Sequence, residues 1–337
     1  MAATAAGRPK LLLVSLGGTI TMTASAGPGI VPTLTGADLV AAVPALADVA
    51  EIEAVSPFRL PGPSLTLAHL RQVARLLNAR LAEDIAGAIV VQGTDTIEET
   101  AFVMDCLVGG DKPVVVTGAM RGAEAPGADG PANLLASAIV ASSPAARGLG
   151  TLVVLNDTIH AARFVQKSST FLPSTFASLS AGPLGSVIEG EACISMRVTR
   201  STIVAGGDEG ADEPVALLTA ALGDDGRLLA GLPGLGYRGL VIEAMGVGHV
   251  PAAVVPALAN LTEVFPVVLS SRVASGPVFA RTYGFPGSET DLLARGLIPG
   301  GMLGGLKARL LLSLLLGVGL HGKALRQAFH GMATPSA

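Results

Sequence analysis

At 337 residues the chain exceeds the size at which one hydrophobic core keeps growing, so two domains are expected. Half of the residues are hydrophobic and 14% are charged, a balance that excludes an intrinsically disordered chain. The net charge of −4, without a basic run, argues against nucleic acid or an anionic membrane as the main partner. The longest apolar run, within Leu310–Leu320, falls short of the ~18 residues of a membrane span, and we expect a soluble, cytoplasmic protein.

The first predicted strand covers Lys10–Ser15 and leads into a Gly-Gly turn. The run is apolar and too short for a helix, which indicates a buried parallel strand. Gly17 and Gly18 allow backbone N–H groups to approach a ligand. The turn brings the hydroxyl of Thr19 to the carboxyl end of the strand, where open α/β sheets bind ligands, so Thr19 is a candidate functional residue.

A polar loop and alternating elements follow this turn. Residues 21–32 are rich in Gly, Ser, Thr and Pro, which predicts a mobile loop. Capping residues and apolar periodicity then predict a helix at 35–43, a strand at 48–59, a Pro-Gly turn at 60–64 and an amphipathic helix, capped by Thr66, at 66–81.

A second strand, turn and hydroxyl occur together at Gly87–Thr100. Here a strand at Ala88–Val91 ends at Gly93, and the tip carries Thr94 and Asp95. The simplest interpretation of a lone Thr-Asp-Thr sequence is a helix N-cap. Two such tips in one chain favour a shared crevice instead, provided that their strands are close neighbours.

The rest of the chain divides into two parts. The alternation continues with a strand at 113–118, a Gly-rich loop at 120–130, a helix at 132–141 and a strand at 149–155. It predicts a parallel sheet with helices on both faces. A β-hairpin or extended arm is expected at 163–186. The polar segment 197–214 is predicted to be a linker between a first domain (1–196) and a smaller α/β domain (215–337). In that second domain we expect short strands at 215–220, 240–243 and 266–270. We expect helices at 251–261 and 303–316, the second of which closes the chain.

The metal-binding side chains are scattered. His69 and His160 have no carboxylate or cysteine at metal-ligand spacing. Cys106 and Cys193 show no CxxC pattern, and we expect two buried thiols rather than a disulfide or a metal site. We therefore expect no metal and no cofactor.

From about residue 10 to its last helix, the chain resembles the bacterial-type L-asparaginases and asparaginase-glutaminases. GGTI and GTDT, about 75 residues apart and followed by a lysine after NDTI, make this signal specific. The resemblance implies a two-domain α/β fold, with a larger N-terminal doubly wound sheet and a smaller, flavodoxin-like C-terminal domain. The matching stretches are Gly17–Ile20 (GGTI), Gly93–Thr100 (GTDTIEET), Lys112–Arg121 (KPVVVTGAMR), Asp129–Leu134 (DGPANL) and Asn156–Lys167 (NDTIHAARFVQK).

The resemblance also implies roles for the polar residues at the two turns. Thr19 is expected to attack the side-chain amide of L-asparagine and form an acyl-enzyme, with weaker activity on glutamine. Thr94 is expected to serve a water or proton transfer, and Lys167 and Asp95 to form a charge pair behind it. The chemistry is sensible, because a threonine hydroxyl is a poor nucleophile without help and a nearby lysine stabilises its alkoxide. Further substrate contacts are expected from Asp95, which could receive the α-ammonium, and from Gly18, Gly93 and Ala119.

Three family features are missing. The family's serine that binds the substrate carboxylate aligns with Gly62, so Ser64 or backbone N–H groups are expected to replace it. The mobile loop has no tyrosine, and Val247 stands where the partner subunit often supplies an asparagine. Tyr283 follows a segment whose family counterpart reaches the neighbour's site, which makes its phenol a candidate catalytic group. The alternative is that Tyr283 packs with Phe285 under a loop.

The expected partners follow from the same resemblance: L-asparagine as substrate and a homo-oligomer, a tetramer built from tight dimers. Two other functions stay open, namely an amidase for another amide and a non-catalytic α/β module that binds a small molecule. Gly62 and the missing loop tyrosine keep the second one open. A dinucleotide site is excluded because LGGTIT lacks the G-x-G-x-x-G pattern. Ammonia release from asparagine distinguishes the enzyme from the binding module.

Overall fold

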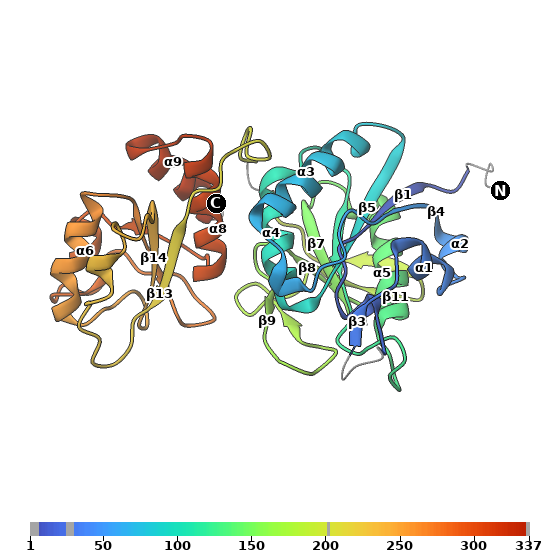
Figure 1. Cartoon of the computed structure of the whole chain (residues 1–337), viewed down its shortest axis with the longest axis horizontal. Coiled ribbons are helices and arrows are strands. Elements are labelled where there is room, and N and C mark those ends of the chain that lie inside the picture. Colours follow the sequence, from blue (N-terminus) through green and yellow to red (C-terminus); the bar gives the residue numbers. More distant parts are fainter. Residues whose placement is uncertain (1–6, 25–29, 201–202, 335–337) are drawn as a thin grey trace. The chain divides into compact units, whose positions relative to one another are not determined.

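The chain separates into two compact α/β units. The computed structural model describes residues 7–24, 30–200 and 203–334 (Figure 1). Contacts between Cα atoms divide it into unit 1, Met1–Arg200, and unit 2, Ser201–Ala337. The predicted two-domain α/β architecture is confirmed. The described residues between Ile194 and Val215, where the linker is predicted, form no helix or strand.

Unit 1 contains an eight-stranded sheet in its described part, with the strand order β12-β11-β8-β7-β6-β5-β1-β4. The strands from β4 to β7 are parallel, and β8, β11 and β12 extend the sheet in antiparallel pairs. The predicted parallel sheet is therefore confirmed as far as β7, and the complete sheet is mixed. Its strands are β1 (Lys10–Ser15), β4 (Glu51–Val55), β5 (Ile85–Val91), β6 (Val114–Thr117), β7 (Thr151–Leu155), β8 (Thr158–Ala161), β11 (Gly185–Ile188) and β12 (Glu191–Ile194).

Helices cover both faces of this sheet (Figure 1). Successive strand residues point to opposite faces, and in β1 both sets are buried. Leu11 and Leu13 share a core cluster with Leu134 of α5, whereas Leu12 and Val14 are buried on the other face. The helices are α3 (Leu67–Leu81) and α4 (Ile97–Leu107) on one side, and α1 (Gly36–Ala41), α2 (Leu46–Val49) and α5 (Gly130–Ser142) on the other.

The order of the strands reverses between β1 and β5. From β1 the chain reaches β4 on one side, and it then returns to form β5 on the other side of β1. β1 and β5 pair in parallel, with Ser15 opposite Val91 at their carboxyl ends. Open α/β sheets bind ligands at such a reversal point. The condition for a shared crevice, that the two strands be neighbours, is thus met.

Two short hairpins flank the carboxyl edge of the sheet. β2 (Met22–Ala24) pairs with β3 (Ile30–Pro32) inside the predicted mobile loop, of which 25–29 lie outside the described residues. β9 (Gln166–Lys167) pairs with β10 (Phe176–Ala177), which confirms the predicted hairpin.

The described residues of unit 2 form a four-stranded parallel sheet in the order β13-β14-β15-β16. The smaller parallel α/β domain is confirmed, although its strands follow in sequence order, whereas the flavodoxin order reverses after the first strand. Its elements are β13 (Val215–Thr219), β14 (Gly239–Ala244), α6 (Val255–Thr262), β15 (Val267–Ser271), α7 (Glu289–Ala294), β16 (Ile298–Pro299), α8 (Gly305–Gly317) and α9 (Gly322–Ala333). Single 3-10 turns are η4 (Pro144–Ala146) in unit 1, and η5 (Leu229–Gly231) and η6 (Ala252–Val254) in unit 2.

Two sequence predictions were wrong in detail. The helix predicted at 303–316 forms α8, but it does not close the chain, because α9 follows it and buries Leu325, Phe329 and Met332, which recur at helical spacing. Cys106 is buried as predicted, whereas Cys193 is exposed because it lies on β12, the terminal strand of the sheet.

His160 on β8 is buried with its Nδ1 atom 2.9 Å from Ser178 Oγ, and burial lowers the pKa of the imidazole to about 4.

Candidate active site

The turn after β1 is in backbone contact with the turn after β5. Gly17 and Gly18 have φ values of 112° and 90°, a conformation that residues with a side chain rarely adopt. A Cβ atom on Gly18 would lie only 1.9 Å from the backbone nitrogen of Gly93. Glycine is therefore required at position 18, and it brings the Thr19 and Thr94 turns directly together.

Thr19 begins the 3-10 turn η1 (Thr19–Thr21), which its neighbour holds in place. The hydroxyl of Thr21 donates a hydrogen bond to the Gly18 carbonyl (2.7 Å), and its N–H donates to the same oxygen (2.9 Å). Thr19 itself is half-buried, and its hydroxyl has no hydrogen-bond partner among the described residues. The hydroxyl is therefore free to meet a ligand.

Thr94, Asp95 and Lys167 meet at the tip of the second turn, η3 (Thr94–Thr96). The ammonium Nζ of Lys167 donates to Thr94 Oγ1 at 3.0 Å and to Asp95 Oδ1 at 2.6 Å. The Lys167 side chain is 17% exposed and that of Asp95 is 63% exposed. The structure thus brings Lys167 to Thr94 and Asp95, from which it is more than 70 positions distant in sequence.

The simpler interpretation of these residues as helix caps does not hold. Thr96 is the N-cap residue of α4, yet its side chain makes no capping hydrogen bond. Thr94 begins the same 3-10 turn, η3, and contacts Lys167 instead. The hydroxyls of this turn are therefore engaged elsewhere.

Glu98 was missed by the sequence analysis. Its carboxylate oxygen Oε1 accepts the backbone N–H of Lys167 at 3.2 Å, which anchors the β9–β10 hairpin to the first turn of α4. Nothing in the local sequence signals this contact, because an acidic residue in the first turn of a helix is ordinary in itself.

Ala119 follows β6, the next strand along the sheet. Its neighbour Gly118 packs near the Thr94 methyl group, because a Cβ on Gly118 would lie 3.4 Å from Thr94 Cγ2. The amide Nδ2 of the buried Asn133 donates to the Gly118 carbonyl (3.0 Å) and to Asp129 Oδ2 (3.1 Å). The segment that carries Ala119 is therefore fixed next to Thr94.

The turn before α3 is the 3-10 turn η2 (Gly62–Ser64), which packs on η3. Ser64 is exposed, and its N–H donates to the carbonyl of Pro61, so this amide is already used within the turn. Gly62 is buried, and a Cβ there would lie 3.2 Å from Thr96 Oγ1 and 3.3 Å from the Gly93 carbonyl oxygen. Any residue other than glycine would crowd this contact.

Tyr283 lies in unit 2. Its ring packs edge-on against His249 (centroids 4.8 Å apart) and lies 6.2 Å from Phe285, and its N–H donates to the buried Glu289 carboxylate at 2.8 Å. The structure thus places Tyr283 in an aromatic cluster with Phe285, and its catalytic role stays a prediction. Val247 accepts the N–H of Phe279 through its carbonyl (2.9 Å) in the same unit.

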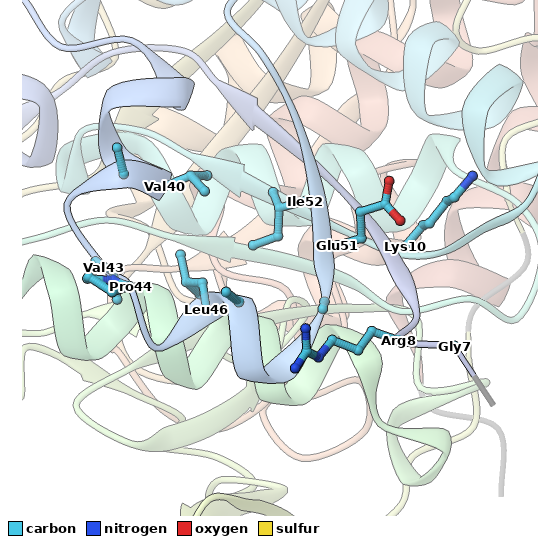
Figure 2. A pocket seen from close by; sticks show the side chains of 12 residues that line it. Gly7, Arg8, Lys10, Val40, Val43, Pro44, Leu46, Glu51 and Ile52 are labelled. Carbon is cyan, nitrogen blue, oxygen red and sulfur yellow. The ribbon is translucent and has the colours of Figure 1, made fainter. Parts of the chain in front are cut away.

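A cavity of about 770 Å³ in unit 1 has none of these residues in its lining, which Figure 2 shows. It is lined by Lys10, Glu51 and Ile52, which begin β1 and β4, together with the apolar side chains of Val40 and Leu46. It therefore opens at the amino end of the parallel strands, opposite to the threonine turns. We exclude it as the reaction site, because Lys10 is bound to Asp84 and its lining has no candidate nucleophile.

The described residues contain no group of three or more His, Cys, Asp or Glu side chains that could hold a metal ion. No helix in the described parts of the chain has the length and apolar character needed to cross a bilayer.

Two protein-family descriptions match the chain, one for each unit. "Asparaginase, N-terminal" matches residues 10–200, and "Glutaminase/Asparaginase C-terminal domain" matches residues 214–329. The chain is 36% identical over 330 residues to a probable L-asparaginase of Deinococcus radiodurans, which covers 95% of this chain and 97% of that protein. It is 32% identical over 338 residues to a probable periplasmic L-asparaginase of Haemophilus influenzae, covering 97% and 94% of the two chains.

Solved structures agree with these matches. The crystal structure of a probable cytoplasmic L-asparaginase from Campylobacter jejuni superposes with a TM-score of 0.87 and 28% sequence identity, and covers 96% of this chain and 100% of that one. Since family descriptions and relatives extend over both units and nearly the full length, the chain belongs to the bacterial-type L-asparaginase family.

Proposed function

We propose that the protein hydrolyses L-asparagine to L-aspartate and ammonia, with Thr19 as the nucleophile and weaker activity on L-glutamine. The observation that carries the proposal is the contact of Lys167 with both Thr94 and Asp95, beside the turn of Thr19. This arrangement offers two hydroxyls and one ammonium–carboxylate pair at the reversal point of the sheet.

In the proposed first step, Thr19 Oγ1 attacks the carbon of the substrate's side-chain amide. The proton of the Thr19 hydroxyl is transferred to the amide nitrogen, the C–N bond breaks, ammonia leaves, and an ester to Thr19 remains. Backbone N–H groups at the starts of η1 and η3 have no partner within their own turns, and they are suited to stabilise the oxyanion. One such donor contributes about 3 kcal/mol in other hydrolases.

In the second step, water attacks the ester, releases L-aspartate and restores the Thr19 hydroxyl. Thr94 orients this water or relays its proton, and the ammonium of Lys167, 3.0 Å away, stabilises negative charge on the Thr94 oxygen. Asp95 holds the lysine, and its exposed carboxylate can also receive the substrate's α-ammonium. Gly18, Gly93 and Ala119 contribute backbone groups, and the Gly62–Ser64 turn receives the α-carboxylate.

Ammonia release by the purified protein tests the proposal. L-asparagine, L-glutamine and an asparagine with an acetylated α-amino group are compared as substrates. We expect the highest kcat/KM for L-asparagine and a strong loss with the acetylated compound, because Asp95 then has no ammonium to bind. Lack of ammonia from all three substrates would refute the proposed function and favour the non-catalytic binding module.

Assembly and location are part of the same proposal. We expect a homo-oligomer, a tetramer of tight dimers, in which Tyr283 reaches the site of a neighbouring copy. One relative is described as cytoplasmic and another as periplasmic, and we propose the cytoplasm for this protein. Light scattering that gives a fully active monomer would contradict the assembly.

A further inference from the structure

We propose that Gln92 and Thr96 are positioning residues, which hold the Gly62–Ser64 turn at a fixed distance from Thr94 and Asp95. The inference rests on the proposed function, since it concerns how the turn for the substrate's α-carboxylate is placed relative to the reacting groups. Neither residue is assigned a direct contact with substrate.

A line of hydrogen bonds connects the end of β5 to the η2 turn. The side-chain amide Nε2 of Gln92 donates to Thr96 Oγ1 (3.0 Å) and to the Gly93 carbonyl (3.3 Å). The Thr96 hydroxyl in turn donates to the carbonyl of Gly62 (3.3 Å). The Thr96 side chain, which belongs to η3, therefore connects Gln92 to the η2 turn.

The burial of Gln92 indicates that its donors serve a purpose beyond packing. The residue is 0% exposed, and its carbonyl oxygen Oε1 has no hydrogen-bond partner among the described residues. An unpaired buried oxygen is unfavourable, and an apolar side chain of similar size would avoid it. What glutamine supplies at this position is the amide N–H₂ group, and its hydrogen bonds go to the η3 turn.

Gly62 fits the same arrangement. A Cβ atom at this position would lie 3.2 Å from Thr96 Oγ1, so a serine here would push against the hydroxyl that anchors the turn. The absence of a side chain lets the Gly62 carbonyl approach Thr96. Gly62 thereby takes part in the contact that holds the turn.

Loss of this anchor should affect substrate binding and length selection more than the chemical step. A misplacement of about 1 Å in a positioning group can cost roughly a hundredfold in rate or affinity. L-asparagine and L-glutamine differ by one methylene group in the distance between α-carboxylate and amide. A loosened turn should therefore raise KM for L-asparagine and reduce its advantage over L-glutamine.

The test compares Thr96→Val with Thr96→Ser and with Thr100→Val as the matched control. Thr100 lies on α4, and its buried hydroxyl has no hydrogen-bond partner among the described residues, so its loss removes no contact. For Thr96→Val we expect about a tenfold rise in KM for L-asparagine, kcat within about threefold, and a lower asparagine-to-glutamine ratio. Thr96→Ser and Thr100→Val should behave like the wild type.

A second variant covers the case in which Thr96→Val does not fold. Gln92→Leu removes the donors together with the unpaired oxygen, so we expect the same rise in KM without a lower unfolding temperature. An unchanged KM in a folded Thr96→Val or Gln92→Leu variant, or a fall in kcat alone, would overturn the inference. A wild type without asparaginase activity would instead refute the proposed function.

Discussion

Replacement of Lys167 by methionine is the sharpest test of the Lys167–Thr94–Asp95 arrangement. The change keeps the length of the side chain and removes its charge. The ammonium lies 3.0 Å from Thr94 Oγ1, and a full charge on that oxygen would interact with it by about 1.4 kcal/mol in water and about 5.5 kcal/mol at an effective dielectric constant of ~20. Each ~1.4 kcal/mol corresponds to a factor of about ten in rate.

The burial of Lys167 decides between these limits. At 17% exposure the ammonium is mostly shielded from water, so we expect kcat to fall about a thousandfold, towards the upper limit. Stability should change little, because Asp95 is 63% exposed and water can replace its partner. Steady-state ammonia release gives kcat, and thermal unfolding gives the stability.

Lys10→Met is the matched control. Lys10 also pairs with an aspartate at 2.6 Å, through Asp84, but it lies at the amino end of β1. We expect this variant to keep wild-type turnover. Activity of Lys167→Met above about a tenth of the wild type, or an equal loss in Lys10→Met, would refute the role of Lys167.

Three further predictions concern single positions. Tyr283→Phe keeps the ring contacts in unit 2, so we expect kcat to fall by more than about tenfold at unchanged stability. A kcat within about threefold of the wild type would show that the Tyr283 ring serves only packing. Gly18→Ala should lower the free energy of unfolding in urea by roughly 3 kcal/mol or more, because the added methyl group clashes with Gly93. Gly110→Ala, at a φ of 80° but in open space, should lower it by about 1–2 kcal/mol. Equal losses in the two variants would contradict the close contact between the turns. His160 has its pKa lowered to about 4 from 6.5, so the unfolded state binds more protons between these values, and the unfolding free energy should rise with pH across that window. His160→Asn should flatten that rise, and an equal slope in both proteins would contradict the assignment.

The sequence was most informative about the parallel core of unit 1. Short apolar runs followed by glycine, such as Lys10–Ser15 and Ala88–Val91, predicted both strands and their functional ends. A parallel strand that is buried on both faces has a continuous apolar sequence, which is easy to identify. The antiparallel extension and α9 were harder to foresee. Strands such as β11 and β12 are short and half-exposed, and their burial pattern is set by neighbours far along the chain.

The site could be predicted in part. Thr19 and Thr94 follow from strand ends, but Lys167 came only from the resemblance, since no local pattern connects it to Thr94. Gln92 and Thr96 were missed for a related reason: their side chains point along a line of hydrogen bonds that involves a turn some 30 residues earlier. A Thr before a helix ordinarily indicates a cap, and only the geometry shows that the hydroxyl is used otherwise.

The central claim is that asparagine is hydrolysed through an ester on Thr19. The most direct measurement is mass mapping of enzyme quenched in acid during turnover of L-asparagine, with Thr19→Ala as a parallel sample. We predict that the peptide containing Thr19 gains the mass of asparagine less ammonia, and that the variant shows neither the adduct nor turnover. Turnover in Thr19→Ala, or an adduct on a different residue, would contradict the account.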